Sequence, residues 1–254
     1  MTSRLAAISR RVLIVAFAGL LGACSVPETP TDIHDPFEES NRKVHTLNKG
    51  LDRVLLRPAS QVYGALLPEE VRTGVDNFTG NLSLPAMVLN KALAGDGEDA
   101  IHNLFRFAVN STIGLGGIFD PATSSFGLEE RYTDFGGTLA AWGVPEGAFL
   151  EVPVFGPSTE RDATGQLVDA VLNPLSVFPR RVLLAGNAGT ITSRLNSRYR
   201  FAVTFDDILY QSADSYAQSR LFYLDNRRFV LSSGGEDTFG TDVYDDLYGD
   251  LYDE

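Results

Sequence analysis

The chain has 254 residues, one cysteine and a formal net charge of −12 at pH 7. Such an acidic balance argues against nucleic acid as a partner and against electrostatic adhesion to anionic lipid surfaces. A single cysteine excludes an internal disulfide, and no stretch approaches the run of about 18 apolar residues that a transmembrane helix needs.

Residues 1–23 have the pattern of a bacterial lipoprotein signal peptide. Three arginines precede the apolar run 12–21, which is too short to span a bilayer. The sequence LGAC then resembles a lipobox, so we expect Cys24 to carry a diacylglycerol and an N-acyl chain. More than one acyl chain is needed for stable anchoring. An ordinary signal peptide with an incidental cysteine is the alternative. Ser25, in place of an aspartate, favours the outer membrane by analogy.

Residues 24–34 form a polar, proline-containing tether, and the helical domain is expected over 35–231. Its first helix is predicted to begin with Asp35 as N-cap and to end at Pro58. A second helix is predicted to open at Pro68, and Pro85 is expected to open a third that closes near Gly95. Apolar residues recur at helical spacing in the first helix at Val44, Leu47, Leu51, Val54 and Leu55, and in a fourth, over 98–111, at Ile101, Leu104, Phe105 and Ala108.

The middle of the chain is rich in Gly, Pro and aromatic residues. Only 148–155 looks strand-like, and Pro153 weakens that prediction. Gly114–Gly117 resembles part of a dinucleotide-binding fingerprint, but no strand precedes it, so we interpret it as a close-packed bend. The charged residues that flank this region are expected to cap and tie loops together: Asp134, Arg161 and Asp162.

The last third of the chain returns to helical patterns, over 166–173, 180–195 and 205–224. Residues 232–254 then carry eight acids and no basic residue. We expect a disordered acidic tail there. A small amphipathic helix that docks on a basic groove is the alternative. Trp142 fits either a core position or a membrane-interface anchor.

Motifs for catalysis or metal binding are absent from the sequence. It contains no G-x-S-x-G, no H-E-x-x-H and no Cys/His cluster, so we expect neither an enzyme nor a metal site. A membrane-bound hydrolase would require Ser111, Ser124 or Ser158 to pair with His45 or His102 through the fold.

Five segments follow one another in the order typical of one protein family. They are DPFEESNR (35–42), LRP (56–58), NFTGNLSLPAMVLNKALAGD (77–96), FAVNSTIGLGGIFDPA (107–122) and DFGGTLAAWGVPEGAFLEVPVFGPSTERD (134–162). Over about residues 35–225 the chain resembles the MlaA (VacJ) family of outer-membrane lipoproteins. The acidic tail falls outside this resemblance.

The resemblance implies a mainly α fold. Short amphipathic helices would form a ring around an amphipathic channel, with little or no β-structure, on the periplasmic side of the outer membrane. Such lipoproteins remove phospholipid mislocalised to the outer leaflet and deliver it to the periplasmic carrier MlaC, which maintains lipid asymmetry. Trimeric outer-membrane porins are further implied partners, and no cofactor beyond the acyl chains is implied.

Residues near the channel are expected in 111–122 and 134–157. Irregular backbone in lipid is tolerated only where protein or a water-filled cavity satisfies its polar groups. A helix end followed by a turn is the alternative role for each candidate. The candidates for the channel region are Asn110, Ser111, Gly114, Gly116, Gly117 and Asp120.

A lipoprotein scaffold that tethers a porin or a periplasmic partner, without passing lipid, is the alternative function. It would use the same lipid anchor and the acidic tail. A scaffold would tolerate bulky side chains at Gly116 and Gly117, whereas a channel would be blocked or would leak.

Overall fold

The computed structural model describes residues 33–177 and 179–233. The predicted signal peptide, the acylation of Cys24 and the character of the tail beyond 233 lie outside these residues. The elements, in chain order, are α2 (Glu38–Leu51), the π-helix η1 (Asp52–Leu56), α3 (Arg57–Leu66), α4 (Glu69–Ala94), α5 (Gly97–Thr112), α6 (Pro121–Phe126), α7 (Phe135–Ala141), β1 (Phe149–Val152), β2 (Gly156–Thr159), α8 (Glu160–Leu172), the 3-10 helix η2 (Pro174–Val177), α9 (Arg180–Arg200), α10 (Ala202–Asp206), the π-helix η3 (Asp207–Gln211) and α11 (Ser215–Ser232).

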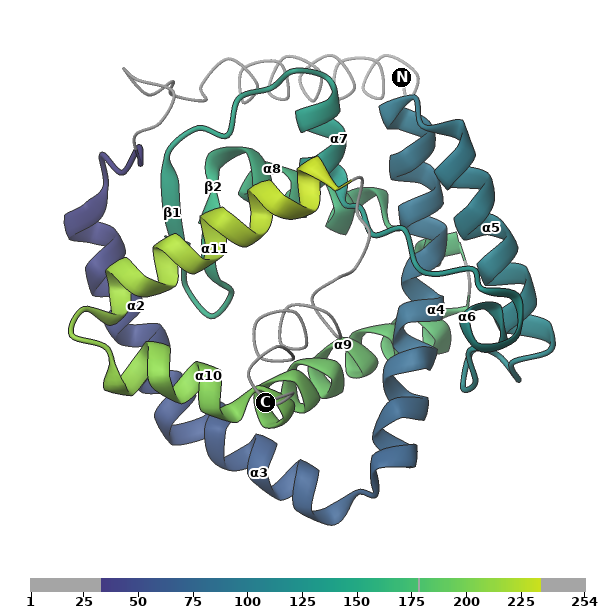
Figure 1. Ribbon diagram of the computed structural model, residues 1–254, viewed down its shortest axis with the longest axis horizontal. Helices are drawn as coiled ribbons and strands as arrows, with labels where there is room; N and C mark the ends of the chain where they lie inside the picture. The colour runs from purple at the N-terminus through teal and green to yellow at the C-terminus, as the bar shows by residue number, and fades with distance from the viewer. Residues whose placement is uncertain (1–32, 178, 234–254) are drawn as a thin grey trace, which may run out of the picture.

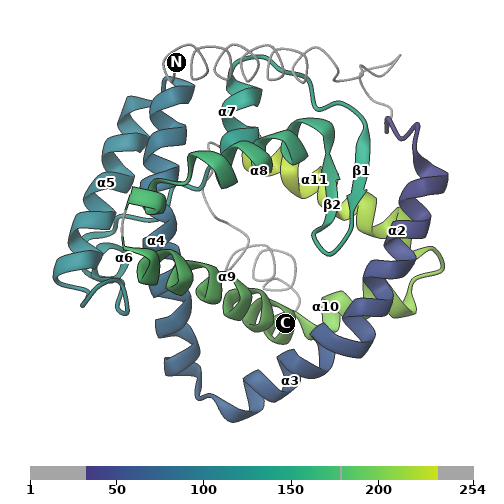
Figure 2. The same cartoon turned by 180° about the vertical axis from the view of Figure 1, so that it is seen from behind.

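The helices are arranged in a ring (Figures 1 and 2). One side is formed by α2, η1 and α3, and the opposite side by α4 and α5, which pack along each other. α7, α8, the β1–β2 hairpin and α11 close the ring between these sides, while α9 packs on both α3 and α4. The predicted mainly α, ring-like fold is therefore confirmed. None of the described helices combines the length and the apolar character needed to cross a bilayer.

Short polar side chains begin five of the helices. The N-cap side chains of α5, α6, α7, α8 and α11 each accept a backbone N–H from the first turn, which satisfies donors that a helix leaves unpaired. The C-terminal end of α4 lies at Gly95, which has a φ of +85°, and a helix end near this glycine was predicted. The five N-caps are Asp96, Asp120, Asp134, Thr159 and Asp214.

The predicted start and end of the first helix are both wrong. Phe37 is the N-cap of α2, and the Asp35 carboxylate instead accepts from Asn41 (2.9 Å) and Arg220 (2.5 Å). At the other end, the helix does not stop at Pro58. The wider π-turn of η1 carries the Arg57 N–H to the Asp52 carbonyl, so Pro58 falls in the first turn of α3, where its missing N–H is tolerated.

The predicted break at Pro85 is also wrong, because α4 runs unbroken from Glu69 to Ala94. An internal proline costs a helix about 3 kcal/mol. Leu84 and Met87 on either side of it are buried, so packing against the rest of the ring offsets that cost.

The predicted helix over 205–224 is two helices. α10 and η3 end at Gln211, the chain is extended at Ser212, and Asp214 caps the new helix α11 by accepting from the N–H groups of Tyr216 and Ala217. The apolar spacing across this break misled the prediction, whereas Asp214 followed by Ser215 is a start signal that it overlooked.

The strand-like segment forms β1, which pairs antiparallel with β2 in a hairpin whose turn contains Pro153. The open edge of β1 is covered by α2. Asn41 bonds the backbone of Phe149 and Glu151, both at 3.0 Å, and Asn48 accepts from the Val154 N–H at 2.7 Å. Side-chain amides thus take the place of a third strand. A small apolar core of Phe149, Tyr216 and Leu224 joins β1 to α11.

Candidate functional site

The described helices turn large apolar side chains outward and bury polar ones. In α5, Leu104 and Phe105 are 52% and 61% exposed, whereas Asn103 and Arg106 on the opposite face are 0% and 4% exposed. The predicted apolar stripe of this helix exists, but it points away from the protein. Large exposed apolar surfaces of this kind mark contact with lipid or with another protein.

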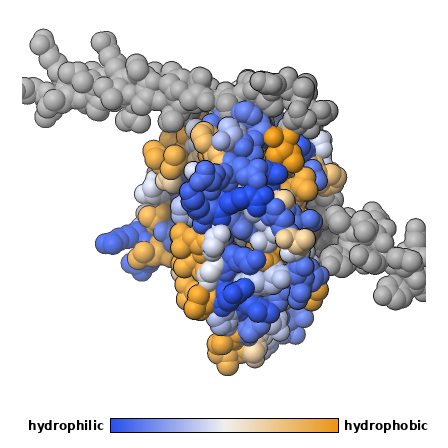
Figure 3. Space-filling model, turned by 90° about the vertical axis from the view of Figure 1, so that its left-hand side faces the viewer, coloured by the Kyte–Doolittle hydropathy of each residue, from blue (hydrophilic) through white to orange (hydrophobic). Residues whose placement is uncertain are grey.

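The same inversion continues along η1 and α3. Val54 and Leu55 are 77% and 66% exposed, while Ser60 and Asp52 are buried. An open apolar groove of about 620 Å³ runs over residues 54–67. On the face of the molecule seen in Figure 3, apolar and polar side chains lie beside one another over the surface.

The predicted channel residues meet in the turn that joins α5 to α6. Asn110 donates to the Asp120 carboxylate at 2.8 Å and accepts from the Ala122 N–H at 3.0 Å. Asp120 also caps α6 and forms an ion pair with Arg106 at 3.1 Å. Burial by itself would raise the pKa of Asp120, but hydrogen bonds from Thr123 and Asn110 and the charge of Arg106 together lower it. These contacts fix the end of α5 against the start of α6.

The glycines of this turn differ in what surrounds them. A Cβ added to Gly114 would lie 2.4 Å from the Phe119 carbonyl oxygen, and one added to Gly117 would lie 2.4 Å from the Asn81 Cβ. A Cβ added to Gly116, which has a φ of +77°, would meet nothing within 4 Å. Asn81 in α4 also donates to Ser111 Oγ at 3.0 Å, so all six candidate residues belong to one tight turn packed on α4. The six residues therefore form a helix end and a turn, which is the alternative role considered for them. That they line a channel stays a prediction.

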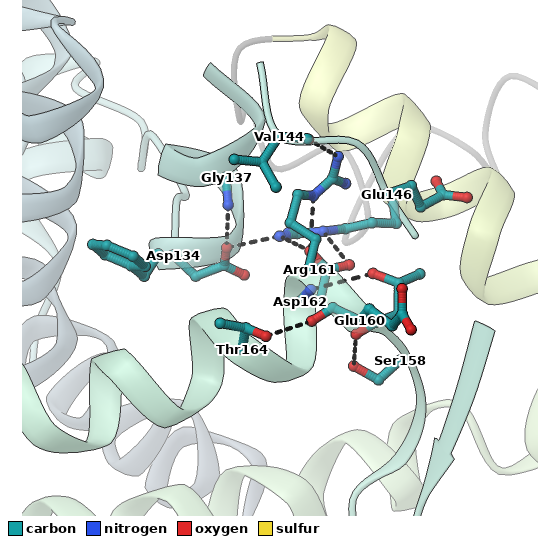
Figure 4. Close-up of polar contacts among 12 residues, drawn as sticks. Asp134, Gly137, Val144, Glu146, Ser158, Glu160, Arg161, Asp162 and Thr164 are labelled. Carbon is teal, nitrogen blue, oxygen red and sulfur yellow. Dashed lines mark hydrogen bonds and ion pairs between the residues drawn. The ribbon is translucent and has the colours of Figure 1, made fainter. Parts of the chain in front are cut away.

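A buried ionic network ties α7, α8 and α11 together. Arg227 of α11 donates to Asp162 Oδ1 at 2.9 Å and to Asp134 Oδ1 at 2.7 Å, and Tyr223 donates to Asp162 Oδ2 at 2.7 Å. Figure 4 shows Asp134 and Asp162 within one group of polar contacts, with Gly137 N–H pointing at Asp134. The prediction that Asp134, Arg161 and Asp162 cap and tie loops is confirmed: Asp134 caps α7, Asp162 holds α11, and Arg161 donates to the Val144 carbonyl at 3.4 Å.

The charge of Arg227 opposes the effect of burial on the pKa of Asp162. Burial would raise the pKa of Asp162, but the charge and hydrogen bonds of Arg227 lower it below its usual value. Sequence reasoning missed Arg227, because its partners lie 65 and 93 residues away. Nothing in its local pattern distinguishes it from Arg228, whose partner Glu146 is partly exposed.

A second network, also missed, links η1 to α9 and α10. Arg198 is buried and forms ion pairs with Asp52 at 2.8 Å and with Asp206 at 2.6 Å. Asp206 in turn accepts from Arg57 at 2.5 Å, and Tyr210 donates to Asp52 at 2.7 Å. Both π-helices therefore meet at the same cluster of charges.

Within the part of the chain that the structure describes, the three serines considered for a hydrolase bond groups other than His45 and His102. Ser111 bonds Asn81, Ser124 bonds the Asp120 carbonyl, and Ser158 Oγ lies 3.5 Å from the Thr159 carbonyl. His102 Nε2 is 2.6 Å from the Glu129 carbonyl oxygen.

His45 meets a different serine. Its Nε2 lies 3.1 Å from Ser215 Oγ, and its Nδ1 lies 3.5 Å from Glu151 Oε1. Ser215 Oγ also accepts from Lys49 at 3.2 Å, and the first free N–H groups of α11 are held by Asp214. These contacts join α2, β1 and α11, and the capped N–H groups are not open to an oxyanion.

Trp142 lies between the two predicted settings. Its side chain is 49% exposed, its indole N–H donates to the Leu93 carbonyl at 2.9 Å, and its ring packs edge-on against Phe135. It therefore anchors the end of α7 to the end of α4 while presenting an apolar edge outward.

Comparisons with known proteins point in one direction. The chain is 32% identical to the intermembrane phospholipid transport system lipoprotein MlaA of Shigella flexneri, over 85% of each chain. It is 31% identical to the lipoprotein of the same name from Escherichia coli (strain K12), again over 85% of each. A protein of Rickettsia bellii (strain RML369-C) with no assigned function is 32% identical over 74% of this chain and 73% of its own.

A solved structure has the same arrangement of elements. It comes from a study of the structural basis for maintenance of bacterial outer membrane lipid asymmetry. The two structures superpose with a TM-score of 0.67 and are 29% identical in sequence, over 78% of this chain and 98% of the solved one. The MlaA lipoprotein family matches residues 33–230. The chain therefore belongs to the MlaA lipoprotein family.

Proposed function

We propose that this chain removes mislocalised phospholipid from the outer leaflet of the outer membrane and delivers it to a periplasmic lipid carrier. It is held on the periplasmic side of that membrane by acyl chains on Cys24. An MlaC-type carrier and trimeric porins are its partners. The transfer makes and breaks no covalent bond, so the chain is a transport protein and no enzyme.

The observation that carries this proposal is the outward apolar surface of a ring of helices, none of which, among the described residues, is both long and apolar enough to cross a bilayer. Lipid satisfies outward-facing side chains such as Phe105, and the polar groups of the ring, such as Asn103 and Arg106, are buried within the protein. Membership of the MlaA lipoprotein family supports the same function, as do the Shigella flexneri and Escherichia coli relatives, which are named as lipoproteins of an intermembrane phospholipid transport system.

A bulky substitution in the α5–α6 turn can distinguish a lipid channel from a passive scaffold. Of Gly116 and Gly117, only one position is suitable for this substitution. Gly117 is unsuitable, because any side chain there meets Asn81 and disturbs the turn itself. Gly116 faces open space, so a tryptophan adds bulk beside the turn. Gly95 is the matched control, since its φ of +85° is similar and an added Cβ also meets nothing within 4 Å.

The test measures phospholipid in the outer leaflet of intact cells with a reagent that does not cross the outer membrane. Cells that lack this protein are expected to accumulate outer-leaflet phospholipid, and the wild type is expected to clear it. Gly116→Trp should fail to clear it, and Gly95→Trp should succeed, at equal levels of both variants in the membrane.

An unchanged outer leaflet in cells without the protein would reject transport and favour the scaffold. Clearance by both variants would keep transport but would remove Gly116 from the channel region.

A further inference from the structure

Three cations of α2, η1 and α3 converge on one aromatic ring. Lys49 Nζ, Arg53 Cζ and Arg57 Cζ lie 5.7, 5.1 and 5.3 Å from the centre of the Tyr210 ring. The three residues are spaced by four, so they share one face of the helical run. We call this group, with Tyr210, the basic cluster.

The basic cluster carries more positive charge than its surroundings neutralise. Within ion-pair distance, Arg57 and Arg198 share the two carboxylates Asp52 and Asp206. Among the residues that the structure describes, no carboxylate lies within that distance of Lys49 or Arg53. A chain with a net charge of −12 therefore holds a local excess of positive charge here.

Donors in the basic cluster remain free for a ligand. Lys49 gives one hydrogen bond, to Ser215 Oγ, which leaves two of its N–H groups. The Arg57 side chain is 40% exposed and holds Asp206 through one terminal nitrogen. Its Nε is buried and is not open to a ligand. Arg53 is exposed, and the face of its guanidinium contacts the ring of Tyr210. The N–H groups at the guanidinium edge can therefore donate hydrogen bonds to an anion.

The basic cluster shares its helical run with an apolar surface, which occupies a neighbouring face of that run. Val54 and Leu55, which follow Arg53 directly, are among the most exposed apolar residues, and they open the groove along η1 and α3. Arginine and lysine next to an apolar, lipid-facing surface extend their charged ends to the level of the headgroups. A forked guanidinium and an ammonium are the groups that bind phosphate oxygens.

We propose that Lys49, Arg53 and Arg57 bind the phosphodiester of a membrane phospholipid, whose acyl chains lie against the apolar surface that begins at Val54. The proposal rests on the proposed function in one respect: it requires this side of the ring to meet lipid. It adds a headgroup site to that function, with a preference for lipids whose headgroup bears a net negative charge.

The test is a calorimetric titration of the full-length protein in a neutral detergent. Three probes are used: dihexanoyl-phosphatidylglycerol, glycerophosphoglycerol and inorganic phosphate. The first carries headgroup and short acyl chains, the second the headgroup alone, and the third the anion alone. The wild type is expected to bind the short-chain lipid most tightly and inorganic phosphate most weakly.

Arg53→Gln is the informative variant, because Arg53 forms no ion pair within the described chain and its loss leaves no carboxylate unpaired. It is expected to weaken binding of the short-chain lipid about tenfold, the loss typical of one charge-assisted hydrogen bond. Arg53→Lys should recover part of the affinity. Arg181→Gln, which removes an exposed cation at the start of α9, should change nothing. Thermal unfolding of each variant serves to check that the fold is retained.

Equal affinity of wild type and Arg53→Gln for the short-chain lipid would overturn the site. Equal binding of all three probes, each weakened by Arg53→Gln, would identify a general anion site and overturn the lipid assignment. Both results are independent of the leaflet assay, so failure here leaves the proposed transport function standing, and failure there leaves the titration intact.

Discussion

Gly117 shows how closely the α5–α6 turn is packed at the scale of a single residue. Its φ is +96°, and a Cβ at this position would lie 2.4 Å from Asn81 Cβ. Gly117→Ala therefore combines a left-handed backbone, which costs about 1–2 kcal/mol, with overpacking, which costs about 1–3 kcal/mol. We expect a total loss of about 2–5 kcal/mol in the free energy of unfolding, measured by urea denaturation followed by circular dichroism in detergent.

Gly116→Ala is the matched variant, since the same turn places it at φ +77° with open space around an added Cβ. Only the backbone cost applies, so it should lose about 1–2 kcal/mol. If the two variants are equally stable, the contact with Asn81 carries no packing constraint and the turn is looser than its geometry indicates.

Single residues were predictable where the signal is local. Asp134 before a helix start is visible in the sequence, because an aspartate before a helical segment is the typical N-cap. Asn41 and Asn48 were not predictable as partners of β1, which lies 103–110 residues away. In the sequence, an asparagine on a helix has the pattern of an ordinary surface residue. Only the three-dimensional structure shows that a strand edge lies beside it.

At the scale of elements, Arg227 holds α11 on α7 and α8. Arg227→Met removes the cation that Asp134 and Asp162 share. Asp162, whose side chain is only 5% exposed, then keeps a single ion pair within the described chain, the longer one with Arg161 Nε at 3.5 Å. Breaking a buried ion pair by removing one partner costs about 3–5 kcal/mol. Arg228→Met is the neighbouring control: its pair with Glu146 is partly exposed, so a loss of about 1 kcal/mol or less is expected.

The same network makes stability depend on pH. The folded pKa of Asp162 lies below its usual 3.8, so its ion pair stabilises the fold fully above about pH 4 and the contribution is lost as the pH falls through the folded pKa. In Arg227→Met the pKa of Asp162 should rise, and acid unfolding should begin at higher pH than in the wild type. Identical acid unfolding of wild type and Arg227→Met, followed by circular dichroism, would contradict this role.

Helix boundaries were the least predictable feature at this scale, for a physical reason. Pro58 and Pro85 are strong stop signals by local propensity. A π-turn places Pro58 in a first helical turn, and burial of Leu84 and Met87 outweighs the cost of Pro85. Both compensations depend on the surroundings in three dimensions, which the local pattern does not contain.

At the scale of the whole molecule, the apolar periodicity correctly predicted which residues share one face of a helix. It did not show whether that face points into the protein or away from it. A stripe such as Ile101, Leu104 and Phe105 marks one face of a helix in any environment. Only the fold reveals that this face is the exposed one and that Asn103 and Arg106 are buried. The family resemblance supplied the ring and the membrane, which periodicity by itself does not distinguish from a water-soluble helical bundle.

An exposed apolar surface is either in water or in lipid, and chemical labelling separates the two. Because acylation occupies the thiol of Cys24 under the proposed function, a cysteine introduced elsewhere is the only reactive one in the chain. We expect Phe105→Cys, at a position 61% exposed in α5, to resist a water-soluble maleimide in isolated membranes and to react after denaturation. Glu98→Cys, exposed at the polar start of the same helix, should react in both states.

The two positions share one helix, so a general change in access would affect both alike. Equal labelling of Phe105→Cys and Glu98→Cys in membranes would place the apolar face of α5 in water. An apolar face that is open to water is not set among acyl chains, so this result would count against insertion in lipid and would favour the scaffold function over lipid transport. Selective protection of Phe105→Cys fits a ring set among acyl chains, because a lipid-buried thiol is neither ionised nor accessible to a water-soluble reagent.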